Sequence, residues 1–201
     1  MAAASTELAP EPFETERRFV LHDVPWWTYV AMRDALEGTG TRMTFLQGAL
    51  ELMSPSDLHG EAKSLIARFV EAWAEEKDVD LRAFGSTTFR REAKQRGLEP
   101  DECYTLGAKE PDGVPHLAIE VVIGSPLVDK LSVYAGLGVS EVWIWRAVAA
   151  RIEVNYLVEG RYELRERSEL LPGIDLAILA RFVRPGESHT ALVKGYRAAI
   201  A

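Results

Sequence analysis

One cysteine and the lack of any long apolar run are the most informative shortages of this sequence. Cys103 is its only cysteine, so the chain has neither an internal disulfide nor a zinc-ligand spacing. No segment approaches the roughly 18 consecutive apolar residues that a membrane helix needs. Residues 1–16 lack the basic and apolar regions of a signal peptide. We therefore expect a protein of the reducing cytoplasm.

Basic residues are also in short supply. The chain has 23 Lys and Arg residues against 31 Asp and Glu residues, for a formal net charge of -8. Proteins that bind nucleic acid are usually basic, because neutralising phosphates provides much of their affinity. A metal-dependent nuclease must nevertheless gather carboxylates, and a local basic strip can coexist with an acidic total. The charge therefore argues against nucleic-acid binding without excluding it.

What is present is an ordinary globular composition. Hydrophobic residues make up 47% of the 201 residues, enough for a substantial core, and no repeat or internal linker interrupts the chain. Residues 1–16 are rich in Ala, Pro and Glu, and we expect them to form a disordered lead-in. Residues 17–201 are expected to form a single domain.

The hydrophobic pattern predicts an α/β fold. Apolar residues at helical spacing follow a capping residue at Ser56 or Asp57, and an almost wholly apolar run at 116–123 is typical of a strand buried on both faces. One central mixed β-sheet flanked by helices, with additional β-hairpins, satisfies the order of the elements. Helices are predicted at 26–36, from 57 onward, at 129–137 and at 176–182; strands at 79–84, 87–91, 102–106, 116–123 and 142–145; and hairpins at 44–53 and 152–165.

Two carboxylates stand out in this pattern. Glu120 interrupts a buried strand, where an isolated charge is costly unless it is paired or binds a metal. An edge position or a core salt bridge explains Glu120 equally well from periodicity alone. Asp101 shifts the balance, because it opens the preceding strand and neighbouring strands can bring the two carboxylates together. Such a pair suits Mg²⁺ or Mn²⁺, with water and phosphate as the remaining ligands.

A lysine near such a site would stabilise the negative charge that develops during phosphodiester hydrolysis. In the usual motif this lysine lies two residues after the glutamate, but Val122 occupies that position here. Lys130, at the start of the next helix, can reach back to the strand, and Tyr134 shares its helical face. From spacing alone, a solvated lysine at a helix start is the favoured interpretation.

Several segments, taken together, resemble the Uma-type restriction endonucleases, a family first catalogued as a domain of unknown function and assigned to the PD-(D/E)XK nuclease superfamily. Each motif is weak by itself, whereas their order and spacing are fairly specific. The resemblance runs from about residue 44 to residue 183. The segments are residues 51–56, 59–60, 85–91, 99–104, 117–122, 129–134 and 138–144.

The resemblance implies a restriction-endonuclease-like core and a metal-dependent endonuclease that acts on nucleic acid, with DNA favoured. It implies that Asp101 and Glu120 hold the metal and that a lysine displaced onto the helix, Lys130, completes the catalytic set. Glu51 matches a further acidic position that would join them. His116 stands where many members carry a second Pro-Asp, so the sequence departs from the family there, and we do not expect it to be catalytic.

Other candidates have weaker support. His59 matches a family histidine that would position water or phosphate, although a capping or packing role explains it at least as well, and Tyr134 is a further supporting candidate. Arg90 and Arg91 begin the one dense basic strip and are candidate phosphate contacts, with a solvated surface as the equal alternative. Cys103 is expected to be a small buried hydrophobe.

The sequence leaves two rival functions open. One is a non-catalytic interaction or scaffold protein that keeps the nuclease fold, and the other is a metal-dependent hydrolase of a phosphoester other than nucleic acid. No recognition domain is apparent, so sequence-specific cleavage would require a homodimer or a second protein. The predicted hairpin at 152–165 and the apolar segment at residues 170–183 are our candidates for a two-fold interface.

Overall fold

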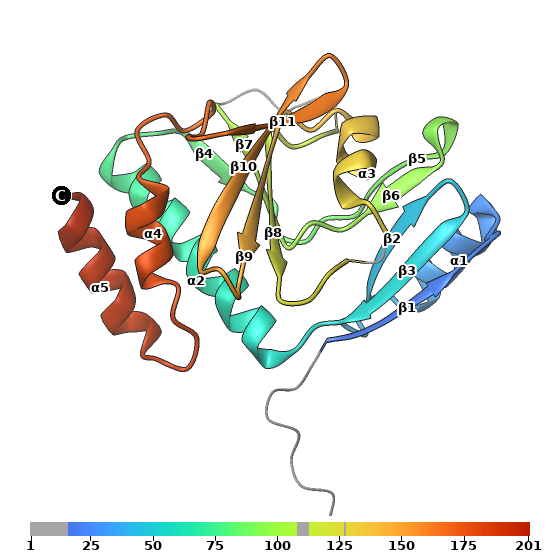
Figure 1. Cartoon of the computed structure of the whole chain (residues 1–201), viewed down its shortest axis with the longest axis horizontal. Helices are drawn as coiled ribbons and strands as arrows, with labels where there is room; N and C mark the ends of the chain where they lie inside the picture. The colour runs from blue at the N-terminus through green and yellow to red at the C-terminus, as the bar shows by residue number, and fades with distance from the viewer. Residues whose placement is uncertain (1–15, 108–112, 127) are drawn as a thin grey trace, which may run out of the picture.

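The computed structural model describes residues 16–107, 113–126 and 128–201, and these form two sheets and five α-helices (Figure 1). Residues 1–15 of the expected lead-in lie outside the described residues. The helices are α1 (Trp26–Ala35), α2 (Asp57–Glu76), α3 (Lys130–Leu137), α4 (Leu176–Phe182) and α5 (His189–Ile200), with a 3-10 turn at Glu92–Lys94.

The strands divide between a larger and a smaller sheet. The larger sheet has the order β11-β10-β9-β8-β7-β4, and the smaller sheet has the order β1-β3-β2-β6-β5. The strands are β1 (Arg17–Leu21), β2 (Arg42–Leu46), β3 (Ala49–Ser54), β4 (Leu81–Ala83), β5 (Phe89–Arg91), β6 (Arg96–Leu98), β7 (Glu102–Leu106), β8 (Leu117–Val122), β9 (Glu141–Arg146), β10 (Arg151–Val158) and β11 (Arg161–Arg165).

The larger sheet is mixed, because β8 and β9 are parallel while its other neighbouring strands are antiparallel. One face is covered by α2 and α4, which pack their apolar side chains on it, and α5 packs on the outer side of these two helices (Figure 1). Side chains of β8 alternate between the faces. Leu117, Ile119 and Val121 therefore join the core under α2, whereas Ala118 and Val122 join the core under α3.

Helix α3 lies between the two sheets. It begins at the cap residue Asp129, whose side chain accepts a hydrogen bond from the backbone N–H of Ser132, and ends at Gly138. Its inner residues pack on both β8–β9 and β6. Contact with β6 is so close that a Cβ atom at Gly136 would lie 2.0 Å from Nη1 of Arg96. The position of α3 fixes where its first residue, Lys130, meets β8.

The smaller sheet carries α1 on its outer face, around the stacked rings of Tyr29 and Phe45. Residues of β1 and β3 that face each other across the ladder share one face of the sheet. The pairing of Arg18 with Met53 and of Val20 with Glu51 therefore places Arg18 and Glu51 on the face opposite the α1 core.

The predicted α/β architecture, with a central mixed sheet, flanking helices and additional hairpins, is confirmed. The single sheet expected for the middle of the chain is wrong in one respect. Strands β4 and β5 follow one another in sequence but belong to different sheets, because β4 pairs with β7 while β5 pairs with β6. Strands β1 and β6 and helix α5 are additions to the predicted elements.

Residues 170–183 of the candidate interface contribute to the chain's own core. Their side chains Leu171, Ile174, Leu179 and Val183 are buried there, whereas Leu176, Ile178 and Phe182 are only partly buried. A two-fold interface through the partly buried side chains stays a prediction. Within the described ranges, no helix is both long and apolar enough to cross a bilayer.

Candidate active site

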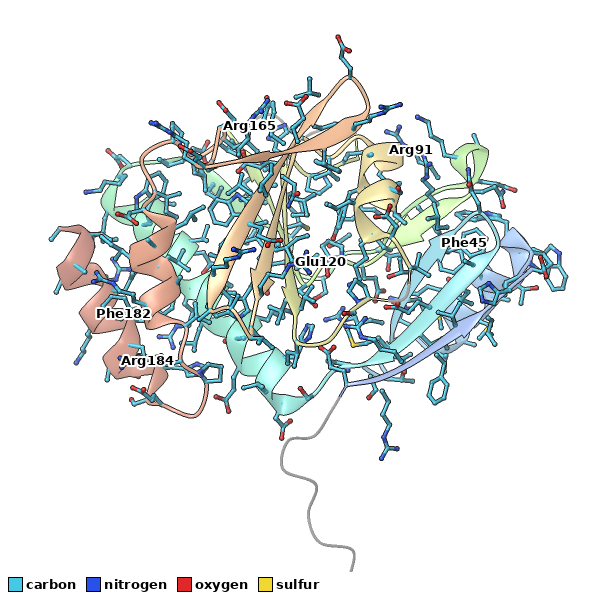
Figure 2. All side chains as sticks on the ribbon, viewed as in Figure 1. Phe45, Arg91, Glu120, Arg165, Phe182 and Arg184 are labelled. Carbon is cyan, nitrogen blue, oxygen red and sulfur yellow. The ribbon has the colours of Figure 1, made fainter. Side chains whose placement is uncertain are left out.

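Asp101 and Glu120 lie next to each other where β7 begins and β8 ends. The antiparallel register pairs Glu102 with Ile119, and one further step places Asp101 opposite Glu120. The Oδ2 atom of Asp101 accepts a hydrogen bond from the backbone N–H of Val121 at 2.8 Å. The side chains of both acids are only 2% exposed. The structure therefore brings the two predicted carboxylates together in a buried position, and Figure 2 shows Glu120 near the middle of the molecule.

Helix α3 supplies two donors to the Glu120 carboxylate. Lys130 Nζ donates to Oε2 at 2.6 Å, and the Tyr134 hydroxyl donates to Oε1 through a short hydrogen bond. Burial raises the pKa of Glu120, the charge of Lys130 opposes that rise, and the charge of Asp101 adds to it. The four-residue spacing of Lys130 and Tyr134 puts both on the helix face that meets β8. Lys130 is thus an ion-pair partner of Glu120, not a solvated lysine.

His59 contacts the other carboxylate from the first turn of α2. Its Nε2 atom lies 2.8 Å from Oδ1 of Asp101, and its Nδ1 atom lies 2.5 Å from Oε1 of Glu16. Burial lowers the pKa of His59, but the hydrogen bonds to these two carboxylates outweigh burial and raise it to about 9. Burial likewise raises the pKa of Asp101, but the hydrogen bond from His59, the charges of His59 and Lys130 and the N–H of Val121 together outweigh burial and bring the pKa down to about 2. The pair is an imidazolium beside a carboxylate near neutral pH.

Strand β1 brings a second cation to this cluster. Arg18 donates from Nε and Nη2 to Oε2 of Glu16, at 3.2 and 2.6 Å, and from Nη1 to Oε1 of Glu51 at 2.6 Å. The other Glu51 oxygen accepts the backbone N–H of Val128 at 3.0 Å. The predicted residue Glu51 therefore reaches the cluster through Arg18. Glu16, which composition places in the lead-in, is part of the cluster as well.

A pocket of about 370 Å³ opens beside Glu120. Its walls include Lys130 and Tyr134, the strand residue Val122 that stands in the usual lysine position, and Arg146 at the end of β9. The volume falls in the range of small-ligand sites, roughly 300–1,000 Å³. A substrate phosphate entering this pocket would meet the Lys130 ammonium group and the Arg146 guanidinium group.

With this geometry, the order of the acidic and basic residues along the chain can be compared with known proteins. Residues 26–184 match the family model Uma2, described as "Putative restriction endonuclease". The chain belongs to the Uma2 family. Among solved structures it is similar to a "putative nuclease belonging to DUF820" from Anabaena variabilis ATCC 29413, with 14% sequence identity and a TM-score of 0.46, over 77% of this chain and 90% of that one. No curated protein matches the chain.

Asp101 and Glu120 are the two carboxylates of this site that could hold a metal. Among the described residues, no group of three or more His, Cys, Asp and Glu side chains is arranged to hold a metal ion. Mg²⁺ often takes only one or two protein carboxylates and keeps several waters. Asp101 and Glu120 meet that requirement, and each carboxylate oxygen has a second lone pair beyond its present hydrogen bond. The donor set therefore fits a hard divalent cation.

Sequence reasoning missed Arg18, Glu16 and Arg146 as members of the site. Arg18 and Glu16 precede the matched residues 26–184, so no family motif pointed to them. Arg146 gave a weak signal, because it ends the strand that pairs in parallel with β8 and faces Val122 in the register. Parallel neighbours that end together place their last side chains at one edge of the sheet, where binding sites of open α/β sheets form.

The predicted phosphate contacts Arg90 and Arg91 lie on β5, an edge strand of the smaller sheet, away from this cluster. Figure 2 shows Arg91 at the periphery and Glu120 near the middle of the molecule. Arg90 is 41% exposed and pairs with Asp34 at 3.3 Å, and Arg91 is exposed.

If both arginines contact the nucleic-acid backbone, replacing them with glutamine should weaken binding to duplex DNA. The slope of log K against log salt should also become shallower, by about one for each phosphate that an arginine no longer neutralises. Binding would be measured by fluorescence anisotropy at several salt concentrations. A double Arg161→Gln, Arg184→Gln variant, which removes the same charge from other exposed positions, is the matched control. Equal slopes in the two double variants would show that Arg90 and Arg91 are solvated surface residues and not phosphate contacts.

Proposed function

We propose that this chain is a metal-dependent endonuclease that hydrolyses phosphodiester bonds of nucleic acid, with DNA favoured. The observation that supports this proposal most directly is the buried pair of Asp101 and Glu120 with the Lys130 ammonium group 2.6 Å from Glu120. Two buried acids side by side repel one another, and a fold keeps such an arrangement where a cation compensates it. Membership of a family described as restriction endonucleases supports the same conclusion.

The residues divide the work according to their contacts. Asp101 and Glu120 would hold Mg²⁺ or Mn²⁺, which when bound polarises the phosphate and lowers the pKa of a water ligand. Lys130 offsets negative charge on the phosphate oxygens as the attacking water approaches, and this charge grows towards the transition state. Tyr134 holds the Glu120 carboxylate in one orientation through its hydroxyl. His59 does the same for Asp101.

A cleavage assay tests the proposal. Purified protein would be incubated with supercoiled plasmid and with single-stranded RNA, in Mg²⁺, in Mn²⁺ and in EDTA. We expect nicking of the plasmid in either metal and none in EDTA. Glu120→Ala should abolish the nicking, whereas Glu163→Ala, at an exposed position of the β10–β11 hairpin, should leave it unchanged. Nicking of equal strength in Glu120→Ala would point to a contaminating nuclease and contradict the proposal.

One observation favours the alternative, a non-catalytic scaffold that keeps the fold. The net charge of -8 works against the phosphate contacts on which nucleic-acid binding depends. A scaffold would show no cleavage of any nucleic acid in any metal. It would also show no metal-dependent change in thermal stability, which separates it from an enzyme whose substrate is a different phosphoester.

A further inference from the structure

The carboxylate of Glu16 is bound as an anionic ligand would be. Its Oε2 atom accepts two hydrogen bonds from the Arg18 guanidinium group, at 2.6 and 3.2 Å, and its Oε1 atom lies 2.5 Å from Nδ1 of His59. The Glu16 side chain is 3% exposed, that of Arg18 8% and that of His59 2%. An anion is therefore held almost out of water by two nitrogen-bearing groups on different elements, β1 and α2.

This anion sits beside the carboxylate pair. His59 contacts Glu16 through one ring nitrogen and Asp101 through the other. Arg18 is close enough to Lys130 for its positive charge to oppose the rise in the pKa of that lysine. The start of β1 and the start of α2 meet at this point (Figure 1). The site at which Arg18 and His59 bind the Glu16 carboxylate therefore adjoins the groups assigned to phosphodiester hydrolysis.

We propose that Arg18 and His59 form a binding site for a backbone phosphate of nucleic acid, and that Glu16 occupies this site in the free protein until the substrate displaces it. The proposal rests on the proposed nuclease function. It deepens that function by naming a phosphate-binding residue, Arg18, and a competing internal anion, Glu16. Arg18 and Glu16 precede the residues matched to the family model, 26–184, whereas His59 lies within them.

A phosphodiester suits the site at Arg18 and His59 for reasons of geometry and charge. A guanidinium group presents its N–H donors as a planar fork that carboxylates and phosphates both accept in a bidentate manner. Each anion carries a single negative charge, so the exchange leaves the charge of the cluster unchanged. The exchange also keeps Arg18 paired throughout. This matters because a buried cation without a counterion is strongly unfavourable.

Glu16 suits the role of a displaceable ligand because of its place in the chain. It lies one residue before β1, so its backbone is outside the β1–β3 ladder, which begins at Arg17. Glu16 can therefore leave its site at Arg18 and His59 without any strand pair opening. Arg18 is by contrast fixed within β1, opposite Met53, and keeps its second contact with Glu51 when Glu16 leaves.

Binding without cleavage tests this inference. A fluorescein-labelled 12-base-pair DNA duplex would be titrated with protein in EDTA, and the dissociation constant would be measured by anisotropy at several salt concentrations. Glu16→Ala should bind about tenfold more tightly than the wild type, because the phosphate no longer has to displace an internal anion. The slope of log K against log salt should stay close to that of the wild type, because the same phosphate contact is made in both complexes. Glu37→Ala, an exposed position just after α1, changes the net charge equally and should not bind more tightly.

A second variant locates the effect at Arg18. The tighter DNA binding of Glu16→Ala should vanish in the double variant Glu16→Ala, Arg18→Gln. If Glu16→Ala loses thermal stability, Glu16→Gln, which keeps the shape of the side chain, takes its place and should show a smaller gain in affinity. Binding that stays equal or weakens in both Glu16 variants would overturn the proposal and leave Glu16 as a residue that only orients His59. Plasmid cleavage by the wild type, measured separately, decides the nuclease function independently of this result.

Discussion

Replacing Lys130 with methionine is expected to slow metal-dependent cleavage by roughly 30- to 1,000-fold, the effect of losing about 2–4 kcal/mol of transition-state stabilisation. The ammonium group lies 2.6 Å from Glu120, at the wall of the pocket that would receive the phosphate. Methionine keeps most of the apolar stem and removes the charge. The rate of plasmid nicking under single-turnover conditions would measure the effect.

A divalent metal should stabilise the folded state of the same variant more than it stabilises the wild type. Without Lys130, the buried Glu120 carboxylate keeps the Tyr134 hydrogen bond but has no ion-pair partner on α3, and a divalent cation would take over that compensation. Lys194→Met, on the exposed face of α5, is the matched control. Full nicking activity in Lys130→Met would show that the lysine is structural.

Moving the lysine back to the usual motif position extends this test. Val122 shares a face of β8 with Glu120 and lines the same pocket as Lys130, so a lysine at position 122 can reach the same region. The double variant Val122→Lys, Lys130→Met should recover part of the activity. The recovery should be incomplete, because Val122 is 7% exposed and packs in the apolar core under α3. A double variant no faster than Lys130→Met would argue that the helix position itself is required.

The part of the site on β7, β8 and α3 could be predicted because its signals are local. A strand with a single acid, a Pro-Asp pair opening the strand before it and a lysine at the start of the following helix lie close together along the sequence, between residues 100 and 130. Strand alternation and helix periodicity then determine which side chains meet. Those two rules allow the contacts of Glu120 with Lys130 and Tyr134, but spacing alone favoured a solvated lysine, and the family resemblance was what pointed to Lys130.

The rest of the site depends on long-range pairing that no local pattern shows. Glu16 lies 43 residues from His59 along the chain, and Arg18 lies 33 residues from Glu51. Strand β1 is short, with alternating exposed and half-buried residues, and its position is set by its pairing with β3. No local pattern in the sequence distinguishes Arg18 from a surface arginine.

Burial of a carboxylate was by itself an incomplete guide to function. Glu141, in β9, is as buried as Glu120, and yet its oxygens accept hydrogen bonds from Trp143, Ser168 and the backbone of Glu169 and Leu170. These contacts tie residues 168–170 to the sheet, which is a structural task. What distinguishes Glu120 is a second buried acid beside it and a pocket in front of it. Neither property can be read from the sequence of one strand.

Mn²⁺ is expected to raise the melting temperature of the wild type by about 5–10 °C when present at about one hundred times its dissociation constant. Ligand that binds only the folded state at that ratio adds about 2.7 kcal/mol of stability. For a domain of this size, each kcal/mol corresponds to roughly 2–4 °C. Asp101→Asn should lose most of this shift, because an amide removes the negative charge and half the anionic pair while keeping the side-chain volume.

The control for that experiment is Glu141, the buried acid with a structural task. Glu141→Gln removes an equally buried carboxylate outside the site, so its melting temperature should fall while its Mn²⁺-dependent shift remains that of the wild type. Asp101→Asn will itself melt at a lower temperature, since its amide nitrogen faces a donor at either Val121 or His59. The comparison therefore rests on the shift that metal adds to each protein and not on the melting temperatures themselves. An equal shift in Asp101→Asn and Glu141→Gln would mean that Mn²⁺ binds elsewhere on this acidic protein, and the buried pair would then owe its compensation to Lys130 and His59 alone.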